Sequence, residues 1–185
     1  EMLYYLDKFI KYIDNWAVCD LMCSNLKIIS KNLDKSFKLI KKLIKTNSEF
    51  KIRVGLVLLL NYYINDNYID EIFNITNNIN NEEYYVKMAI AWLLSICYIK
   101  YPIKTIDYLK NNNLSNWVQN QTIQKIKESN RVTSKDKKII YAYPSGKTGT
   151  TYNIPTISEM NRLLFLQEAE SLKYLPEIIF SLSIL

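Results

Sequence analysis

The sequence of 185 residues contains no histidine. This absence excludes Ser-His-Asp and Cys-His catalytic machinery, and it excludes zinc or haem held by imidazole. Any general base must therefore be an aspartate, glutamate, lysine, tyrosine or cysteine. Glycine occurs 3 times and proline 4 times. These counts are too low for a sheet protein rich in turns, so long helices are predicted.

Cysteines and long apolar runs are also scarce. The cysteines are Cys19, Cys23 and Cys97, an odd number without zinc-ribbon spacing, so we expect free, partly buried thiols, a reducing compartment and no metal site. The longest apolar run centres on residues 56–60, far short of the ~18 residues that a membrane span needs. We find no signal peptide and expect a cytoplasmic protein with no cofactor and no membrane contact.

What the sequence does contain is positive charge, with 24 Lys and Arg against 18 Asp and Glu. Residues 1–137 hold 20 basic and 14 acidic side chains, whereas residues 138–185 hold 4 of each. The surplus favours a polyanionic partner such as nucleic acid or acidic lipid. An AT-rich coding sequence, indicated by the many Ile, Asn, Lys and Tyr residues, is an alternative source of part of the lysine excess.

Apolar periodicity predicts helices near residues 2–13, 15–29, 35–46, 49–64, 67–78, 84–100, 103–112 and 116–129. The expected helix starts are marked by Asp14 or Asn15, Ser48, Asp66, Pro102 and Ser115. The chain opens on a helix-periodic stretch without a start signal, so we expect upstream helices of the same domain to be missing.

Helix pairs recur at a nearly constant spacing. Trp16, Arg53 and Trp92 mark it, 37 and 39 residues apart (16 to 53 and 53 to 92). This period predicts an all-α, HEAT-like solenoid of antiparallel helix pairs, whose inner helices form one curved face. An ordinary helical bundle has the same helix count and stays open as the alternative.

Composition changes near residue 140, beyond which lie Pro144, Pro155 and Pro176 and two of the three glycines. We therefore predict a repeat domain over residues 1–137 and an atypical extension over residues 138–185. Within the extension, residues 143–156 are expected to form a loop, and residues 158–173 and 175–184 two short helices.

A helical wheel of residues 15–29 predicts which of its side chains face the core. The predicted core face contains Ala17, Val18, Leu21, Met22, Leu26, Ile28 and Ile29. Trp16 and Asp20 lie outside that arc, one turn apart, so they can act side by side. A tryptophan opposite the core loses its burial energy unless a neighbouring helix or a ligand covers it.

The helix predicted over residues 49–64 is apolar nearly all round, as a central inner helix would be. Its only charge between residues 52 and 64 is Arg53. A lone guanidinium there needs an anionic partner, either a carboxylate such as Asp20 or a phosphate. Trp92 shares a stripe with apolar residues and is compatible with a place in the core.

The helix predicted over residues 35–46 is basic and amphipathic. It carries lysines at 35, 38, 41, 42 and 45 around an apolar stripe. Its lysines either form a solvated face or track phosphates. Lys35, Lys38 and Lys42, together with Lys87 and Arg53, are the candidate DNA contacts.

Three segments in order resemble the AlkD-like DNA alkylation repair family. Residues 15–20 read NWAVCD, residues 50–53 read FKIR and residues 84–92 read YYVKMAIAW. The pair Tyr101-Pro102 and residues 125–131 are similar to the last repeats of the family. The resemblance covers about residues 1–137.

The resemblance implies a HEAT-like DNA glycosylase that excises cationic N3- and N7-alkylated purines from double-stranded DNA. It implies that Trp16 and Trp92 contact the sugar-phosphate of the lesion nucleotide, that Asp20 is the catalytic carboxylate and that Arg53 holds the DNA backbone. It further implies that the base is not flipped into a pocket, unlike in most glycosylases. A monofunctional enzyme is expected, because no lysine is placed for Schiff-base chemistry. We also expect a monomer.

The predicted chemistry suits a site without histidine. A cationic alkylpurine leaves without a general acid, so one carboxylate between aromatic walls can stabilise an oxocarbenium-like sugar and guide water to it. The alternative is a non-catalytic HEAT-like module, truncated or inactive, that binds DNA or protein.

Overall fold

The computed structural model of the chain describes residues 2–141. These residues form ten α-helices and no strand, which confirms the predicted all-α class. The helices are α1 (Met2–Ile10), α2 (Trp16–Asn25), α3 (Ile28–Lys31), α4 (Leu33–Ile44), α5 (Glu49–Tyr62), α6 (Ile69–Asn77), α7 (Tyr84–Lys100), α8 (Pro102–Lys110), α9 (Asn116–Glu128) and α10 (Ser134–Tyr141).

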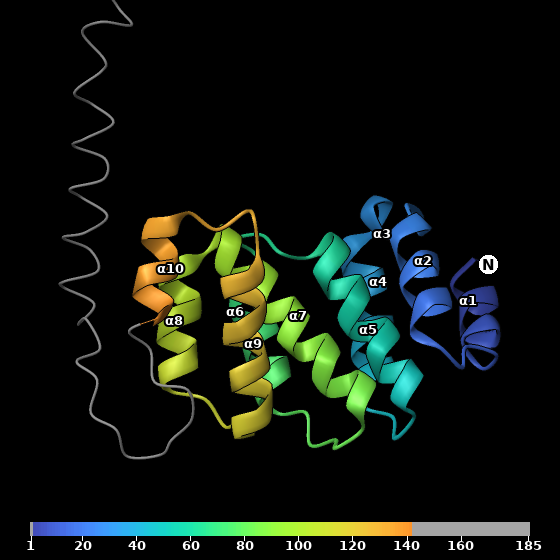
Figure 1. The fold of residues 1–185 in the computed structure, drawn as a ribbon. Helices are drawn as coiled ribbons and strands as arrows, with labels where there is room; N and C mark the ends of the chain where they lie inside the picture. The colour runs from blue at the N-terminus through green and yellow to red at the C-terminus, as the bar shows by residue number, and fades with distance from the viewer. Residues whose placement is uncertain (1, 142–185) are drawn as a thin grey trace, which may run out of the picture.

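Two layers of helices build the array (Figure 1). Helices α2, α5, α7 and α9 pack in series and form what we call the front layer. Helices α4 and α8 pack behind α5 and α7, and α6 lies between them, because its side chains contact both neighbours. We call α4, α6 and α8 the back layer. This arrangement of antiparallel pairs is the predicted helical repeat.

Equivalent hydrogen bonds join consecutive back-layer helices. The hydroxyl of Tyr68 donates to Asp34 in the first turn of α4, at 2.7 Å. One repeat later the ammonium of Lys104 donates to Asp70 in the first turn of α6, at 2.9 Å. Both pairs are 34 residues apart in the sequence. The repetition of one contact at one spacing is expected of a repeat array, in which each unit packs mainly on its neighbours.

Helix α5 is the centre of the core, as its composition predicts. All residues from 52 to 59 are buried, because α2, α4 and α7 contact α5 on three sides. A helix with neighbours on three sides cannot keep a polar face, which explains why this stretch is apolar nearly all round. Arg53 is the only charged residue between residues 52 and 59.

The predicted helix over residues 15–29 is wrong in extent and in orientation. Helix α2 ends at Asn25, where the side chains of Ser24 and Asn25 both donate to the carbonyl oxygen of Leu21. Short polar side chains that bond the backbone in this way compete with helix continuation.

The core face predicted for this segment changes with the break. Cys19 and Cys23 are fully buried, whereas Ala17, Val18 and Leu21, which were predicted to face the core, are exposed. Ile29 is buried as predicted, but on the separate helix α3. Met22 and Leu26 are half-buried against the core, as predicted. A wheel drawn through residues 15–29 as one helix therefore missed the two buried cysteines and included three residues that face solvent.

The predicted helix starts are confirmed at four places, of which one lacks the predicted side-chain cap. The side chains of Asn15 and Ser115 accept hydrogen bonds at the starts of α2 and α9, and Pro102 occupies the first turn of α8. Ser48 precedes α5 without a side-chain cap. Asp66 does not start α6, because residues 65–68 form a turn and the helix begins after Tyr68.

The C-terminal predictions fall largely outside the described residues. Helix α10 runs from 134 to 141 and was not predicted. It crosses the boundary predicted between residues 137 and 138. The loop expected over residues 143–156 and the helices expected over 158–173 and 175–184 lie beyond residue 141, outside the described part of the chain.

Gly55 sits where α4 and α5 approach closely, which makes its replacement by alanine a test of this packing. An added Cβ would lie 2.6 Å from Cγ1 of Ile44 and 3.4 Å from the carbonyl oxygen of Ile40. Alanine gains about 1 kcal/mol of helix propensity, but overpacking costs roughly 1–3 kcal/mol. We expect Gly55→Ala to lower the free energy of unfolding by about 1 kcal/mol in a urea titration.

The matched background for this test is Ile44→Ala, which removes the clashing atom. There Gly55→Ala is expected to stabilise the protein, since only the propensity gain remains. The packing explanation is wrong if Gly55→Ala has the same effect in both backgrounds.

Candidate functional site

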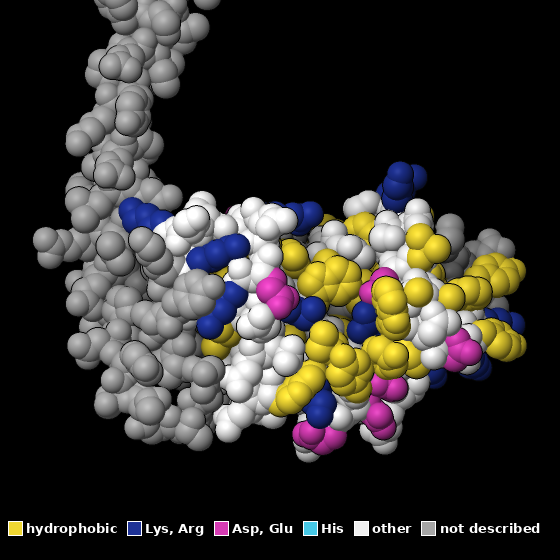
Figure 2. All heavy atoms as spheres, viewed as in Figure 1, with side chains coloured by type: hydrophobic (Ala, Val, Ile, Leu, Met, Phe, Trp, Pro, Cys, Tyr) yellow, Lys and Arg dark blue, Asp and Glu magenta, His cyan; other side chains and the backbone are white. Residues whose placement is uncertain are grey.

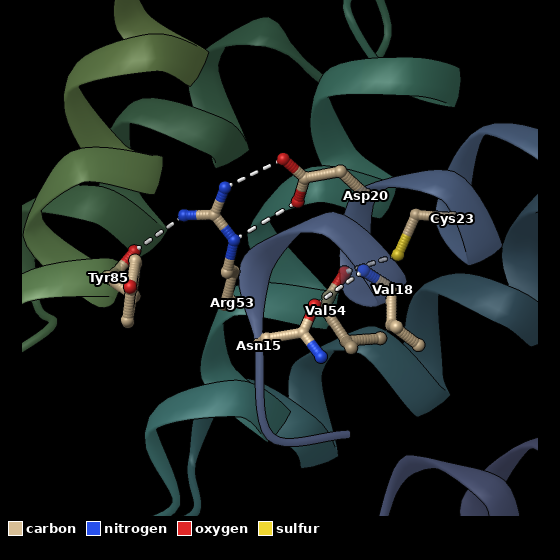
Figure 3. A network of polar contacts seen from close by, with 7 residues as sticks. All are labelled: Asn15, Val18, Asp20, Cys23, Arg53, Val54 and Tyr85. Atoms are coloured by element: carbon tan, nitrogen blue, oxygen red, sulfur yellow. Dashed lines mark hydrogen bonds and ion pairs between the residues drawn. The ribbon is translucent and has the colours of Figure 1, made fainter.

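Asp20 of α2 and Arg53 of α5 form a bidentate ion pair (Figure 3). Nη2 of Arg53 lies 2.8 Å from Oδ2 of Asp20, and Nε lies 3.1 Å from Oδ1. The side chain of Arg53 is 6% exposed and that of Asp20 is 18% exposed. Of the two anionic partners predicted for Arg53, the structure shows the carboxylate. The pair is thus shielded on the arginine side and partly open on the aspartate side.

Apolar packing places the two charges opposite each other. Helix α2 docks on α5 through Cys19 and Cys23, which are fully buried, and the thiol of Cys23 donates to the carbonyl oxygen of Val54 at 3.8 Å. Asp20 follows Cys19 in the sequence and Arg53 precedes Val54. The contact that brings the helices together therefore also brings the carboxylate to the guanidinium.

The same arginine reaches the next front-layer helix. Nη1 of Arg53 donates to the carbonyl oxygen of Tyr85 in α7 at 3.0 Å (Figure 3). Glu49, one turn before Arg53, accepts the backbone N–H of Tyr85 at 2.8 Å. This N–H lies in the first turn of α7, where helix amides have no partner within the helix. Two side chains of α5 thus hold the start of α7 by its backbone.

Sequence reasoning missed Glu49 and Tyr85. The one available signal was the spacing of Glu49 and Arg53, four residues apart on the same helix, where side chains share a face. The bonds to Tyr85 span 36 and 32 residues. They depend on how α7 is shifted along α5, which no local pattern reveals.

The two predicted aromatic residues lie on the helices that flank α5. Trp16 is the first residue of α2, one turn before Asp20, and is 53% exposed. No helix among residues 2–141 covers it fully, so the ring remains accessible to a ligand. Trp92 lies on α7, two turns beyond Tyr85, half-buried against the core. Both interpretations predicted for Trp92, core and site wall, remain compatible with this position.

The predicted lysine contacts divide between the two layers. Lys87 belongs to α7 in the front layer. Lys35, Lys38 and Lys42 are exposed on α4 in the back layer, on the side of the helix away from the residues that pack on α5. The structure does not bring these three lysines to the ion pair. Their contact with DNA stays a prediction.

Other polar chemistry on the described residues is limited. They contain no cluster of three or more histidine, cysteine, aspartate or glutamate side chains able to hold a metal. Burial raises the pKa of the Cys97 thiol to about 12. The pKa of Cys23 is raised mainly by a hydrogen bond with Cys19 and, to a smaller extent, by burial. These two thiols are therefore protonated near neutral pH and are poor nucleophiles.

Between residues 2 and 141 we also find no helix with both the length and the apolar character needed to cross a membrane. Hydrophobic side chains gather on the open face over α2, α5 and α7, with charged side chains between them (Figure 2). On that face Asp20 is a carboxylate with fixed geometry beside an accessible indole. The arrangement can stabilise positive charge that develops on a bound ligand.

Loss of the guanidinium tests how much of the structure depends on the ion pair. Arg53→Met keeps the apolar stem but leaves Asp20 and the Tyr85 carbonyl without their partner, so we expect a loss of about 2–4 kcal/mol in the free energy of unfolding. Asp20→Asn retains a carbonyl oxygen that can accept one of these bonds, so a smaller loss is expected. Urea unfolding followed by circular dichroism measures both. Equal stability of Arg53→Met and the unchanged protein would contradict this account.

Comparison with known proteins identifies the family of the chain. A search of curated proteins and a search of solved structures gave no match. The family model described as "DNA alkylation repair enzyme" matches residues 1–126, which include Asp20, Arg53, Tyr85 and both tryptophans of the site. This match covers more than half of the chain, and it confirms the family predicted from the three sequence segments. The chain therefore belongs to the DNA alkylation repair enzyme family.

Proposed function

We propose that the protein is a DNA glycosylase that hydrolyses the N-glycosidic bond of cationic N3- or N7-alkylated purines in double-stranded DNA. The observation that carries this proposal is the carboxylate of Asp20, which is fixed by two hydrogen bonds and partly open beside Trp16. A fixed carboxylate at the edge of an apolar surface suits the stabilisation of a developing cation.

The chemistry demands little else of the protein. The alkylated base already carries positive charge, so it departs as a neutral base and needs no general acid. As the glycosidic bond breaks, positive charge moves onto the sugar ring, and Asp20 stabilises that charge by electrostatic attraction. The same carboxylate accepts a hydrogen bond from the water that attacks C1′, and the proton that this water loses passes through Asp20 to solvent. No histidine and no metal is required.

Arg53 acts in this proposal by positioning Asp20. Three of its five N–H groups are used by Asp20 and the Tyr85 carbonyl. With a side chain that is only 6% exposed, its main role is to hold the carboxylate rather than to contact a phosphate. The DNA-backbone contact predicted for Arg53 would have to come from the remaining N–H groups.

Trp16 and Trp92 supply the walls of the site. Trp16 stands one turn from Asp20 with half of its surface free, so its ring can pack on the deoxyribose of the lesion nucleotide. Trp92, which is half-buried on α7, is the proposed second wall. Apolar rings around the sugar exclude water and thereby strengthen the attraction between the sugar cation and Asp20. A monomeric, cytoplasmic enzyme without cofactor remains our expectation.

Replacement of the carboxylate tests the proposed chemistry. Asp20→Asn keeps the shape of the side chain but removes its charge, so we expect the rate of 7-methylguanine release from alkylated duplex DNA to fall about 10²–10³-fold. Release is measured by chromatography of the freed base under single-turnover conditions. The matched control is Asp34→Asn, which removes an equal charge from α4 and should leave the rate unchanged.

The alternative function, a non-catalytic helical-repeat module, gives a different result. It predicts salt-sensitive DNA binding, or none, with no base release by the unchanged protein. Base release that is equally fast in Asp20→Asn and the folded parent would overturn the role of Asp20. Folding of each variant is checked by its circular dichroism spectrum and unfolding midpoint.

A further inference from the structure

A row of aromatic rings leads from the ion pair across the front layer. The guanidinium carbon of Arg53 lies 5.8 Å from the centre of the Tyr85 ring. The centres of Tyr85 and Tyr84 are 5.3 Å apart, and those of Tyr84 and Trp117 are 5.9 Å apart. Phe50 contacts Tyr85 from α5 at 5.5 Å. The row therefore joins α5, α7 and α9 without interruption.

The far end of the row is open to solvent and carries a cation. Tyr84 is 56% exposed and Trp117 is 36% exposed. The ammonium of Lys87 lies 5.2 Å from the centre of the Trp117 ring and 3.1 Å from a carboxylate oxygen of Glu82. We call Tyr84, Lys87 and Trp117 the α7–α9 cluster. The proposed glycosylase chemistry uses none of its aromatic rings.

We propose that the α7–α9 cluster binds the phosphodiester backbone of the duplex beside the lesion. The apolar faces of Tyr84 and Trp117 fit the deoxyribose, and the ammonium of Lys87 fits a phosphate. The inference rests on the proposed function for the identity of the ligand. It adds a second contact region, one helix pair further along the array than Arg53, that fixes where the duplex lies.

Continuity and charge argue for DNA as the occupant. The cluster shares a continuous ring row with Arg53, so a duplex seated at Asp20 and extended across the front layer meets it next. The ammonium of Lys87, held 5.2 Å from the centre of the Trp117 ring, is the cation that the cluster presents to a phosphate. A protein partner that binds this surface instead would leave DNA affinity independent of the cluster.

The ion pair between Lys87 and Glu82 makes a testable difference to how the cluster binds an anion. The side chain of Glu82 is 80% exposed, whereas that of Lys87 is 20% exposed. The carboxylate of Glu82 is open to solvent and packs little on the protein, so Glu82 can move aside and a phosphate can replace it. Glu82 therefore competes with the ligand for Lys87.

A matched set of charge variants tests this competition. We expect Lys87→Gln to lower the affinity for a duplex about three- to tenfold and to reduce the slope of log K against log salt by about 1. Glu82→Gln is expected to raise the affinity two- to fivefold, by removing both the competitor and a negative charge. Fluorescence anisotropy with a labelled, undamaged duplex measures both.

The controls come from a second lysine–carboxylate pair, which lies on the back layer. The ammonium of Lys104 lies 2.9 Å from Asp70, with side chains that are 48% and 74% exposed. Lys104→Gln and Asp70→Asn make the same charge changes and should shift the affinity much less. Equal effects of the two pairs would overturn the proposal, since they would reflect net charge alone.

The aromatic part of the cluster is tested at Trp117. We expect Trp117→Ala to lower duplex affinity about tenfold and Trp117→Phe to restore most of it, because phenylalanine keeps an apolar ring. Tyr12→Ala is the matched control, since Tyr12 is 80% exposed and lies at the other end of the array. An unchanged affinity in folded Trp117→Ala would overturn the proposal.

Measurements of DNA binding and of base release distinguish failure of this inference from failure of the proposed function. If the parent protein releases 7-methylguanine while the cluster variants bind DNA normally, the enzyme assignment stands and the cluster inference fails. If the parent binds DNA through the cluster but releases no base, the inference stands and the glycosylase proposal fails. Absence of both binding and release overturns both.

Discussion

The ion pair between Asp20 and Arg53 is the contact on which the front layer depends. Taking a guanidinium into an apolar helix costs free energy that a salt bridge seldom recovers fully, and well-packed apolar residues are often as stable. Arg53 offsets that cost by donating three hydrogen bonds, two to Asp20 and one to the Tyr85 carbonyl. One side chain thus links α2, α5 and α7. A charge retained in the most apolar helix is better explained by the carboxylate it holds than by stability.

The sequence predicted the part of this arrangement that follows from local composition. Helix α5 is apolar because its neighbours surround it, and in that setting the single charge of Arg53 required an anion, of which Asp20 was one of two alternatives. The orientation of α2 was not predictable in the same way. Its buried face consists of Cys19 and Cys23, small residues that contribute little to a hydrophobic wheel, whereas the larger Leu21 is 68% exposed. The break at Asn25 depends on two side-chain bonds to one carbonyl.

Contacts between helices lay beyond the reach of sequence patterns. The repeat spacing indicated which helices are equivalent, but not how far each one is shifted along its neighbour. That shift decides that Glu49 and Arg53 meet the backbone of Tyr85, and that Trp117 meets Tyr84. The lysines of α4 show the same limit. The sequence showed that these lysines share one face of the helix. Only the burial of Phe37, Ile40 and Leu43, where α4 packs on α5, shows that this face points away from the front layer.

The distribution of charge between the layers has a consequence for how DNA is bound. A helix is about 10 Å in diameter, whereas the screening length at physiological ionic strength is about 8 Å. Cations on the outer side of α4 therefore lie more than one screening length from a duplex on the front layer, and their attraction is largely lost in salt. They can speed encounter at low ionic strength without fixing the position of the duplex. Position must then come from groups on the front layer itself, where a few charges stand among aromatic rings. In the proposed function, such a surface would hold a sugar-phosphate backbone by packing as well as by charge, and Asp20, on the open side of its pair with Arg53, would be the carboxylate that faces the reacting sugar.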